Sequence, residues 1–591
     1  MDTIEFYKLV DKEIDVLIRR YKDNPYLKKQ KKEDGKKSFA FLLWFLNRYS
    51  PGLNNLETFI TDGHDDASCD IIFENSDNFG QKVFYVVQSK WNSESNIKGT
   101  SGVSKEIKAC LNDFTLISKG KKTPSTINLN FTKKYSELLE HINASGETKF
   151  IFLTLGKGKH DALDNINAFN EDYPFEIINI DRLKRDYVEM VYKGARTHNP
   201  IETPYIPKGN IEIEFTQDNN IFIESPYISY ILLIRPKLVY ELFTKYGFAL
   251  FYNNIRNPLF KSNFNENIAL TVKDNPFQFW YFNNGVTAIS DHINKIRVGS
   301  KKVTVKGLQI INGAQTIFSI YNSYKNANAS ERAKMDSDAI ITFRLLKSGG
   351  KDFDLNVTRY TNSQNPVSER DFHANDEVQI NLQNEFLDNT GIWFERRRGE
   401  FRTRHKGTAI IPNEYLGQTY LAYTLQDPLS AKGKIKLLFI TENINKEGLY
   451  DKVFNQKTKY DDMLTSYFLY EFIEKKKAIV VKQIKAIEPN ADSTYKPKDI
   501  QTLQLEFVLH ASFHILMLFN IALLKKYESK SLNGILLSNF KNNRMEEIEV
   551  IYFDIIDKVR VYVNKEKTKD QRFTYTKYFK SVESLNIKSL V

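Results

Sequence analysis

The chain of 591 residues contains only two cysteines, Cys69 and Cys110. This scarcity excludes both a disulfide framework and a four-cysteine zinc site, and it suits a reducing compartment. No Gly-x-x-x-x-Gly-Lys-Ser/Thr sequence occurs, so we do not expect an ATP-driven motor of the P-loop class. The N-terminus has neither the basic start nor the apolar run of a secretion signal, and we therefore expect a cytoplasmic protein.

Long hydrophobic runs are also scarce, and only residues 507–524 are long and apolar enough to span a bilayer. This run contains His510, Ser512, His514 and Asn520, which favour a buried core helix over a membrane span. The two histidines have the i, i+4 spacing of metal ligands, but no carboxylate-rich motif accompanies them. We therefore expect core histidines with hydrogen-bond partners, and no membrane partner.

Neither sign of charge dominates the chain. There are 84 Lys and Arg residues against 73 Asp and Glu residues, which gives a formal charge of +11. This excess is compatible with a polyanionic partner, although a lysine-rich composition produces the same sum without a binding face. Hydrophobic residues make up 41% of the chain and include 42 Phe and 32 Tyr, so several domains can each bury a core.

The sequence pattern predicts an α/β multidomain protein with three zones. Residues 1–200 alternate between helical and strand patterns, residues 209–425 mix strands and helices as an α+β domain, and residues 426–591 are mainly helical. The stretch 197–210 holds three prolines and a glycine, which is typical of a domain boundary.

Strand and helix patterns within the first zone can be assigned individually. We expect strands at 58–62, 69–74, 82–91, 149–155 and 175–180, and helices at 38–48, 98–118, 135–143 and 181–192.

Three polar residues follow from this strand pattern as a candidate catalytic group. Asp70 opens the second predicted strand, and the third strand ends in Gln88-Ser89-Lys90. Alternation places Gln88 and Lys90 on one face, and a hairpin would bring Asp70 to that face. Asp70 and the Gln88 side-chain oxygen suit Mg²⁺ or Mn²⁺, with Asp66 as a further candidate ligand, and Lys90 would activate water and offset phosphate charge. A lysine at the end of a buried strand and beside a metal would be costly unless it is used.

This arrangement resembles the PD-(D/E)xK restriction-endonuclease superfamily in its Mrr-like variant, which has an Asp-rich turn and Gln in place of the usual Glu. The resemblance implies a restriction-endonuclease-like fold and a metal-dependent nuclease with the three residues above as its catalytic core. The chain has Ala67 and Ser68 where relatives have glycines, and residues 38–48 lack the Glu that some relatives supply from the first helix. The alternative is structural, with Asp70 capping a turn and Gln88–Lys90 forming the polar end of an edge strand.

The second zone is rich in amides beside aromatic and aliphatic strands. Residues 250–323 include FQFWYFNNGVTAIS and LQIINGAQTIFSIYNS, and TRYTNSQNPVSERDF and WFERRRGEF follow. Side-chain amides can bind bases or sugars, and arginines can hold phosphate. Candidate nucleic-acid or nucleotide ligands are Asn284, Asn312, Gln315, Thr316, Arg344, Asn362, Gln364, Asn365, Arg396, Arg397 and Arg398. The alternatives are amides that bridge buried strands or cap turns, and a solvated basic turn at the three arginines.

These segments, in order over roughly residues 209–480, resemble the abortive infection phage resistance (AIPR) protein family. The resemblance implies bacterial anti-phage defence, and members often carry an Mrr-like N-terminus. We expect a defence effector whose N-terminal domain hydrolyses nucleic acid, DNA in preference to RNA, under the control of the AIPR domain. A homo-oligomer, an inhibitory partner or a phage-derived trigger would hold such a nuclease in check. Two alternatives stay open: an inactive nucleic-acid-binding regulator, and a nucleotide-binding sensor whose central domain controls the nuclease domain.

Overall fold

The chain was analysed as a computed structural model. The residues that it describes are 1–50, 52–76, 82–98, 104–123, 126–144, 146–156, 166, 169, 173–196, 200–201, 207, 209–216, 220–254, 263–362, 369–442, 447–487, 496–527, 532–570 and 572–591. They form two compact units. One comprises Met1–Val367, Leu387–Ile392 and Arg397–Thr408, and the other comprises Ser368–Phe386, Trp393–Arg396 and Ala409–Val591. Most of the predicted boundary at 197–210 lies outside the described residues.

The N-terminal part of the first unit is built on a four-stranded sheet. Its strands, in spatial order, are β1 (Ile71–Ser76), β2 (Lys82–Lys90), β3 (Glu147–Thr154) and β4 (Phe175–Ile178). The first pair is antiparallel and the other two pairs are parallel. These strands match four of the five predicted ones. The prediction of a strand at 58–62 is wrong, because the turn η1 (Leu56–Phe59) occupies its start and Ile60 makes only an isolated bridge to Ile71.

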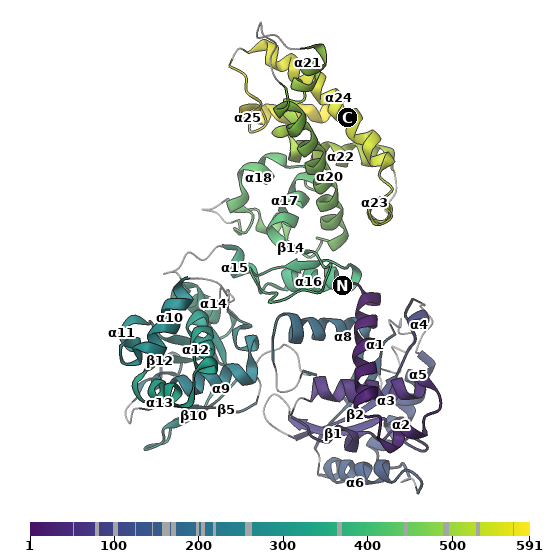
Figure 1. Cartoon of the computed structure of the whole chain (residues 1–591), viewed down its shortest axis with the longest axis vertical. Helices are drawn as coiled ribbons and strands as arrows, with labels where there is room; N and C mark the ends of the chain where they lie inside the picture. The colour runs from purple at the N-terminus through teal and green to yellow at the C-terminus, as the bar shows by residue number, and fades with distance from the viewer. Residues whose placement is uncertain are drawn as a thin grey trace. The chain divides into compact units, whose positions relative to one another are not determined.

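Helices cover both faces of this sheet. They are α1 (Thr3–Arg20), α2 (Pro25–Lys29), α3 (Glu33–Tyr49), α4 (Glu94–Lys98), α5 (Ser104–Ser118), α6 (Leu129–Asn143) and α8 (Ile180–Tyr187), and the π-helical turn η2 (Val188–Tyr192) follows α8. Alternate sheet residues such as Phe84 and Phe150 share a core with α5 and α6. The intervening residues face the other way, and α3 packs against β2 (Figure 1). The helix predicted at 98–118 is two helices, because α4 ends at Lys98 and α5 begins at Ser104.

The rest of the first unit contains two further sheets. The smaller has the order β5 (Ile211–Glu214), β10 (Lys302–Lys306) and β9 (His292–Ile293). The larger has the order β11 (Gln309–Asn312), β8 (Val286–Ser290), β12 (Ile341–Lys347), β7 (Ser229–Ile234) and β6 (Ile221–Ile223). The helices and turns of this part are α9 (Pro236–Tyr246), η3 (Phe248–Phe251), α10 (Asn263–Asp274), η4 (Pro276–Gln278), α11 (Phe279–Phe282), α12 (Ala314–Asn326), α13 (Ala329–Asp338) and α14 (Lys351–Asn362). Apolar residues of α9 and α12 form one core with alternate residues of the larger sheet.

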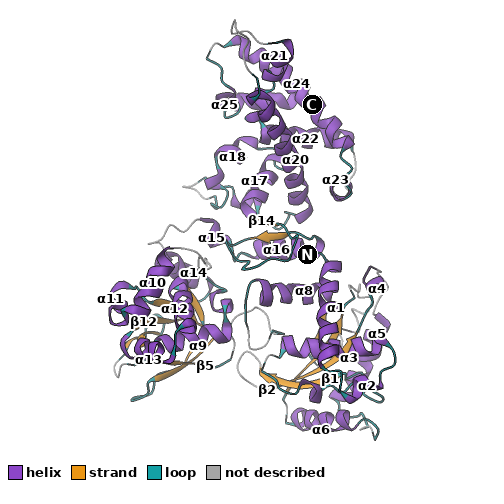
Figure 2. Cartoon of the chain, in the orientation of Figure 1, coloured by secondary structure: helices purple, strands orange, loops and turns teal. Residues whose placement is uncertain are grey.

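The second unit is mainly helical, as the sequence predicts for the C-terminal zone. Figure 2 shows it as helices around the short parallel pair β13 (Trp393–Glu395) and β14 (Ile410–Pro412). Its helices and turns are α15 (Glu369–His373), most of α16 (Glu377–Asn389), α17 (Asn413–Tyr423), α18 (Pro428–Gly433), η5 (Ile435–Leu437), α19 (Tyr450–Val453), α20 (Tyr460–Lys485), α21 (Pro497–Leu503), η6 (Glu506–Leu509), α22 (Ser512–Lys526), α23 (Leu532–Lys541), α24 (Glu546–Lys569), α25 (Tyr575–Tyr578) and η7 (Val582–Leu590).

The apolar run 507–524 is not one helix, because the chain bends between η6 and α22. Among the described residues no single helix has the length and apolar composition to cross a membrane. The bent pair Lys498–Leu509 and Ser512–Lys526 meets that test only when both pieces are counted together. Much of α22 is buried within the unit, and the side chain of His514 bonds to the Ser584 hydroxyl at 2.8 Å. The expected core histidine is therefore present at this position.

A candidate metal centre at the end of the N-terminal hairpin

Pairing of β1 with β2 joins Asp70 to Gln88. Asp70 directly precedes β1, and its N–H donates to the Val87 carbonyl at 2.8 Å. This register turns the Asp70 carboxylate toward the end of β2, where Oδ2 accepts from the Ser89 N–H at 2.6 Å and from the Gln88 amide at 2.8 Å. The structure therefore brings together two residues that lie eighteen positions apart in the chain.

Lys90 lies at the same end of the hairpin and lines the same cavity as Asp70 and Gln88. Alternation along β2 explains why Gln88 and Lys90 reach one space. Lys90 is exposed at the last position of β2, and the middle of this strand is buried. Because the side chain is exposed there and also lines the cavity, its charge is available to an incoming anion.

Two further carboxylates come from the turn before β1. One ligand oxygen from each of Asp62, Asp66 and Asp70 can be chosen so that all three lie within 4.8 Å of one another. The sequence predicts Asp66 as a candidate ligand but not Asp62, which falls in the strand expected at 58–62. The spacing 62, 66, 70 is a signal that could have found it, since each Asp lies four residues from the next.

The path of this turn depends on unusual backbone conformations. Asp65, Ala67 and Ser68 have φ values of 59°, 55° and 57°, in the left-handed region that favours glycine. The Asp66 carboxylate accepts from the N–H groups of Gly63 and Ser68, at 2.9 and 3.1 Å. Ala67 and Ser68 therefore adopt the conformation of a glycine turn although neither is glycine. These bonds stabilise the strained backbone of the turn, and so does the Ser68 hydroxyl, which donates to Asp113 at 2.6 Å.

Burial and mutual repulsion shape the electrostatics of the three carboxylates. Asp70 is only 7% exposed, and burial raises its pKa well above the usual range, with the Asp62 charge raising it further. The Ser89 N–H and the Lys90 charge act in the opposite direction. Burial also raises the pKa of Asp66. Like charges held this close in a desolvated position favour binding of a proton or a cation.

The N-terminal helices close the space around these groups. A cavity of about 420 Å³ is lined by Tyr26 of α2, by Gly35, Ser38 and Leu42 of α3, and by Asp62, Asp66, Ser68, Asp70, Gln88, Ser89, Lys90 and Trp91. The Tyr26 hydroxyl donates to Asp62 at 2.6 Å. Burial and this bond raise the pKa of Tyr26 far above its ordinary value, so the phenol stays a donor. In the described part of α3, no acidic side chain lines the cavity, in agreement with the absence of Glu from 38–48.

The donor set fits a hard divalent cation. Three carboxylates and one side-chain amide supply only oxygen ligands of the kind that Mg²⁺ and Mn²⁺ prefer. Cys69 is next to Asp70 in the chain, but its buried thiol contacts the Ala67 carbonyl instead. The site therefore offers no described thiolate or imidazole ligand that would favour zinc.

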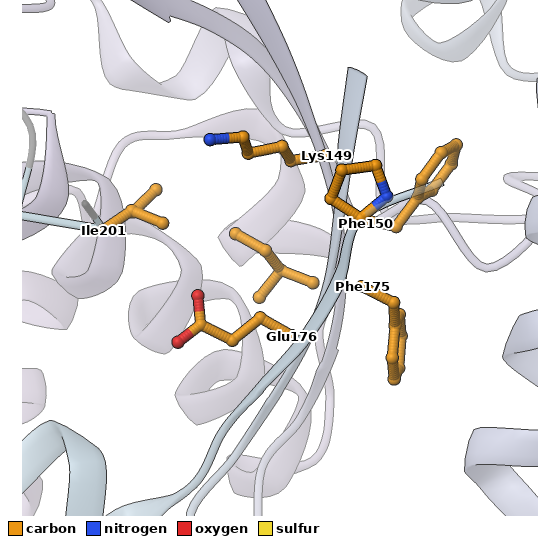
Figure 3. Close-up of a pocket in the computed structure, with 7 residues that line it drawn as sticks. Lys149, Phe150, Phe175, Glu176 and Ile201 are labelled. Carbon is orange, nitrogen blue, oxygen red and sulfur yellow. The ribbon is translucent and has the colours of Figure 1, made fainter. Parts of the chain in front are cut away.

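A second pocket, of about 230 Å³, lies where β3 meets β4. Figure 3 shows Lys149 and Glu176 on the side of the strands where Ile201 lies, with the Phe150 and Phe175 rings on the other side. The Glu176 carboxylate already pairs with Arg182 at 3.0 Å, and Lys149 pairs with Glu147 at 3.3 Å. None of the predicted site residues lines this pocket.

Two of the amide-region candidates have structural partners. The Asn312 amide donates to the carbonyl of Thr361 near the end of α14. The Thr316 hydroxyl accepts from the Asn283 amide at 3.2 Å, and the Asn283 oxygen accepts from the Gly285 N–H at 2.9 Å. For Thr316 the alternative of a residue that ties a turn to a helix is therefore the better description.

The remaining amide-region candidates divide by exposure. Asn284 and Arg344 are exposed, and Gln315 is half-buried in the first turn of α12. The side chain of Asn362 and the whole of Gln364 and Asn365 lie outside the described residues.

The three consecutive arginines are not a shared basic surface. Arg396 is 4% exposed, and its guanidinium donates to the Gln383 side chain at 2.9 Å and to the Ala374 carbonyl at 2.6 Å. Arg397 is 5% exposed and donates to the carbonyls of Phe251 and Tyr252. Both guanidiniums are therefore buried and bonded to backbone and amide oxygens within the chain, which favours a structural role for Arg396 and Arg397. Only Arg398 of this run is exposed.

Comparison with known proteins identifies the family but supplies no relative of known activity. The family model described as AIPR protein matches residues 251–577, which is more than half of the chain. This match begins later than the predicted resemblance and extends through most of the helical unit. No curated protein and no solved structure matches the chain. The chain belongs to the AIPR protein family.

Proposed function

We propose that the N-terminal part of this protein is a metal-dependent nuclease of the PD-(D/E)xK type. The observation that carries the proposal is the convergence of three carboxylates on one cavity, with Gln88 and Lys90 beside them at the end of a hairpin. Phosphodiester hydrolysis needs anionic metal ligands next to a cation that can offset charge on the phosphate, and this cavity contains both.

The side chains of the cavity have separable roles in this proposal. Asp62, Asp66 and Asp70 would hold Mg²⁺ or Mn²⁺, and Gln88 would turn its amide so that the oxygen faces the ion. The bound ion would lower the pKa of a water molecule and offset charge on the phosphate. Exposed Lys90 would orient the phosphate and stabilise the negative charge that grows on it.

Family membership supports a role in anti-phage defence by abortive infection. We propose that the nuclease is the effector and that the AIPR region, which the family model matches over residues 251–577, regulates it. The substrate we favour is DNA rather than RNA. An inhibitory partner, a phage-derived trigger or self-association would keep the activity low in uninfected cells.

A cleavage assay with matched lysine variants tests the proposal. Plasmid, linear DNA and RNA are incubated with wild type, Lys90→Ala and Lys82→Ala, in Mg²⁺ or Mn²⁺ and in EDTA. Lys82 is an exposed lysine at the opposite end of the same strand, where it pairs with Glu74 at 2.6 Å. Lys90→Ala should lower the cleavage rate by about 10²–10³-fold, and Lys82→Ala should leave it unchanged.

A second candidate function is nucleic-acid binding without cleavage. The observation that favours it is that no acidic side chain from the described part of α3 lines the cavity. This candidate would be established, and the nuclease rejected, by two results together. The protein would bind DNA with the same affinity in Mg²⁺ and in EDTA, and neither wild type nor Lys90→Ala would cleave nucleic acid in extracts of phage-infected or uninfected cells.

A further inference from the structure

One face of the five-stranded sheet carries Arg344, Thr287 and Asn312 in a row that crosses three strands, next to the place where Val357 of α14 packs on Ile289 and Leu346. Helices α9 and α12 pack on the opposite face, where they contact sheet residues such as Phe343 and Leu345 of β12. The strand registers place five residues side by side from β6 to β11: Ile221, Ile231, Arg344, Thr287 and Asn312. Ile221 is 60% exposed and Arg344 is exposed, so this end of the face is open to solvent.

Arg344 is at the centre of this row. Its neighbours in the strand point into the core, so alternation directs its side chain away from α9 and α12. It makes no hydrogen bond or ion pair with any part of the chain that the structure describes, and it is the only charged residue of the row. An arginine without a carboxylate partner on an open face is suited to an anionic ligand.

Aromatic side chains border the same face. The Trp280 indole N–H donates to the Thr342 hydroxyl at 3.0 Å, and Thr342 precedes Arg344 by two positions. Thr342 and Arg344 are same-face neighbours about 6.6 Å apart, so this bond holds the indole N–H at the edge of the face that carries Arg344. The Tyr281 ring packs edge-on against Trp280, with ring centroids 5.2 Å apart. Tyr281 and Phe282 follow in α11 and are 74% and 70% exposed. A cluster of exposed rings is costly in water unless a ligand covers it.

We propose that this face binds single-stranded nucleic acid, with bases stacked on the α11 aromatics and a phosphate held by Arg344. Exposed Asn284, two residues after the end of α11, and the hydroxyl of Thr287 would supply hydrogen bonds to base edges or sugars. The proposal concerns a binding surface outside the N-terminal cavity and does not depend on the nuclease assignment.

The combination of groups favours a single strand over other occupants. Unpaired bases expose their flat faces to aromatic rings, whereas a duplex hides them in its own stack. A protein partner that buried Arg344 would have to bring a carboxylate to it, because an unpaired buried charge is strongly unfavourable. A single strand supplies both the flat apolar faces and the anion that this surface lacks.

Fluorescence anisotropy of the full-length chain in EDTA tests the proposal, since EDTA removes metal-dependent cleavage. The probes are labelled oligo-dT and oligo-U of about 15 nucleotides, within the range of known single-strand sites, and a duplex of the same length. Tyr281→Ala should weaken single-strand binding by at least about fivefold through lost stacking. Arg344→Gln should weaken it by about tenfold and reduce the slope of log affinity against log salt by about 0.7.

Two control variants separate this face from general effects. Arg20→Gln removes an exposed arginine of α1, and Phe553→Ala removes a 54% exposed ring of α24. Both should bind as wild type does. Comparison of oligo-dT with oligo-U shows whether DNA or RNA is the ligand.

The proposal is overturned if Tyr281→Ala and Arg344→Gln bind as tightly as the controls, or if no probe binds. It is also overturned if the duplex binds as well as the single strands and Tyr281→Ala has no effect, because backbone charge alone would then explain binding. Sedimentation of the same proteins adds a third outcome. Loss of an oligomer in these variants without loss of binding would assign the face to a second copy of the chain.

Discussion

Replacing Asp62 by Asn should stabilise the metal-free protein near neutral pH and abolish much of its response to Mg²⁺. The ligand oxygens of Asp62 and Asp70 lie within 4.8 Å of one another. Two unit charges at that separation repel by about 3.5 kcal/mol at an effective dielectric constant of about 20, which is an upper estimate because protonation relieves part of it. Asn retains an oxygen that can accept the bond from Tyr26, so the substitution removes charge and little else.

Thermal unfolding of the full chain, with and without Mg²⁺, measures this effect. Trp91 lines the cavity and provides a local fluorescence signal. In EDTA the variant should unfold up to about 10 °C above wild type, if 1 kcal/mol corresponds to about 2–4 °C for a domain of this size. Mg²⁺ at about 100 times its Kd should stabilise wild type by about 2.7 kcal/mol and the variant by much less.

The pH dependence of wild type in EDTA has a defined sign. The pKa of Asp70 is raised in the folded chain, so stability from this group is present below the unfolded pKa of about 3.8 and is lost as pH rises through the folded value. Asp62→Asn should reduce that loss. Asp65→Asn is the matched control, because Asp65 is exposed in the same turn and Asn tolerates its φ of 59°. A variant less stable than wild type in EDTA, or a Mg²⁺ response that Asp62→Asn and Asp65→Asn share equally, would refute the reasoning.

Two further substitutions test the rest of the chain. Burial lowers the pKa of His514 from 6.5 to about 3, so its stabilising contribution is full above pH 6.5 and is lost as pH falls toward 3. At pH 5 the second unit should lose about 2 kcal/mol through this group. Urea unfolding should show that the His514→Gln variant does not lose this stability between neutral pH and pH 5. The control variant His64→Gln, which changes an exposed histidine, should lose as much stability as wild type does. Gly285→Ala should destabilise the first unit by about 2–5 kcal/mol, because φ is +77° and the new Cβ would lie 2.3 Å from the Thr342 carbonyl oxygen. Gly299→Ala has a similar φ of +78° but open space around it, so it should cost only about 1–2 kcal/mol, and equal losses at both glycines would contradict the steric argument.

The sequence alone predicts several features of the candidate site because they depend on local periodicity. Alternation in a strand decides that Gln88 and Lys90 share a face, and the hairpin pattern decides that Asp70 can meet them. The helical character of the C-terminal unit likewise follows from apolar residues at spacings of three and four. Each of these properties is set by the chemistry of near neighbours in the chain.

Tertiary structure alone decides which polar side chains stay free. Arg396, Arg397 and Arg398 are identical in sequence terms, yet only Arg398 is exposed, because the other two satisfy buried oxygens from distant segments. Asp62 joins the carboxylate cluster because the turn before β1 folds back over left-handed residues. Arg344 is exposed because the pairing of β12 turns Phe343 and Leu345 into the core with α9 and α12 and directs Arg344 away from it. Local pattern specifies the face on which a side chain lies, but contacts between segments far apart in the sequence determine whether its charge finds a partner.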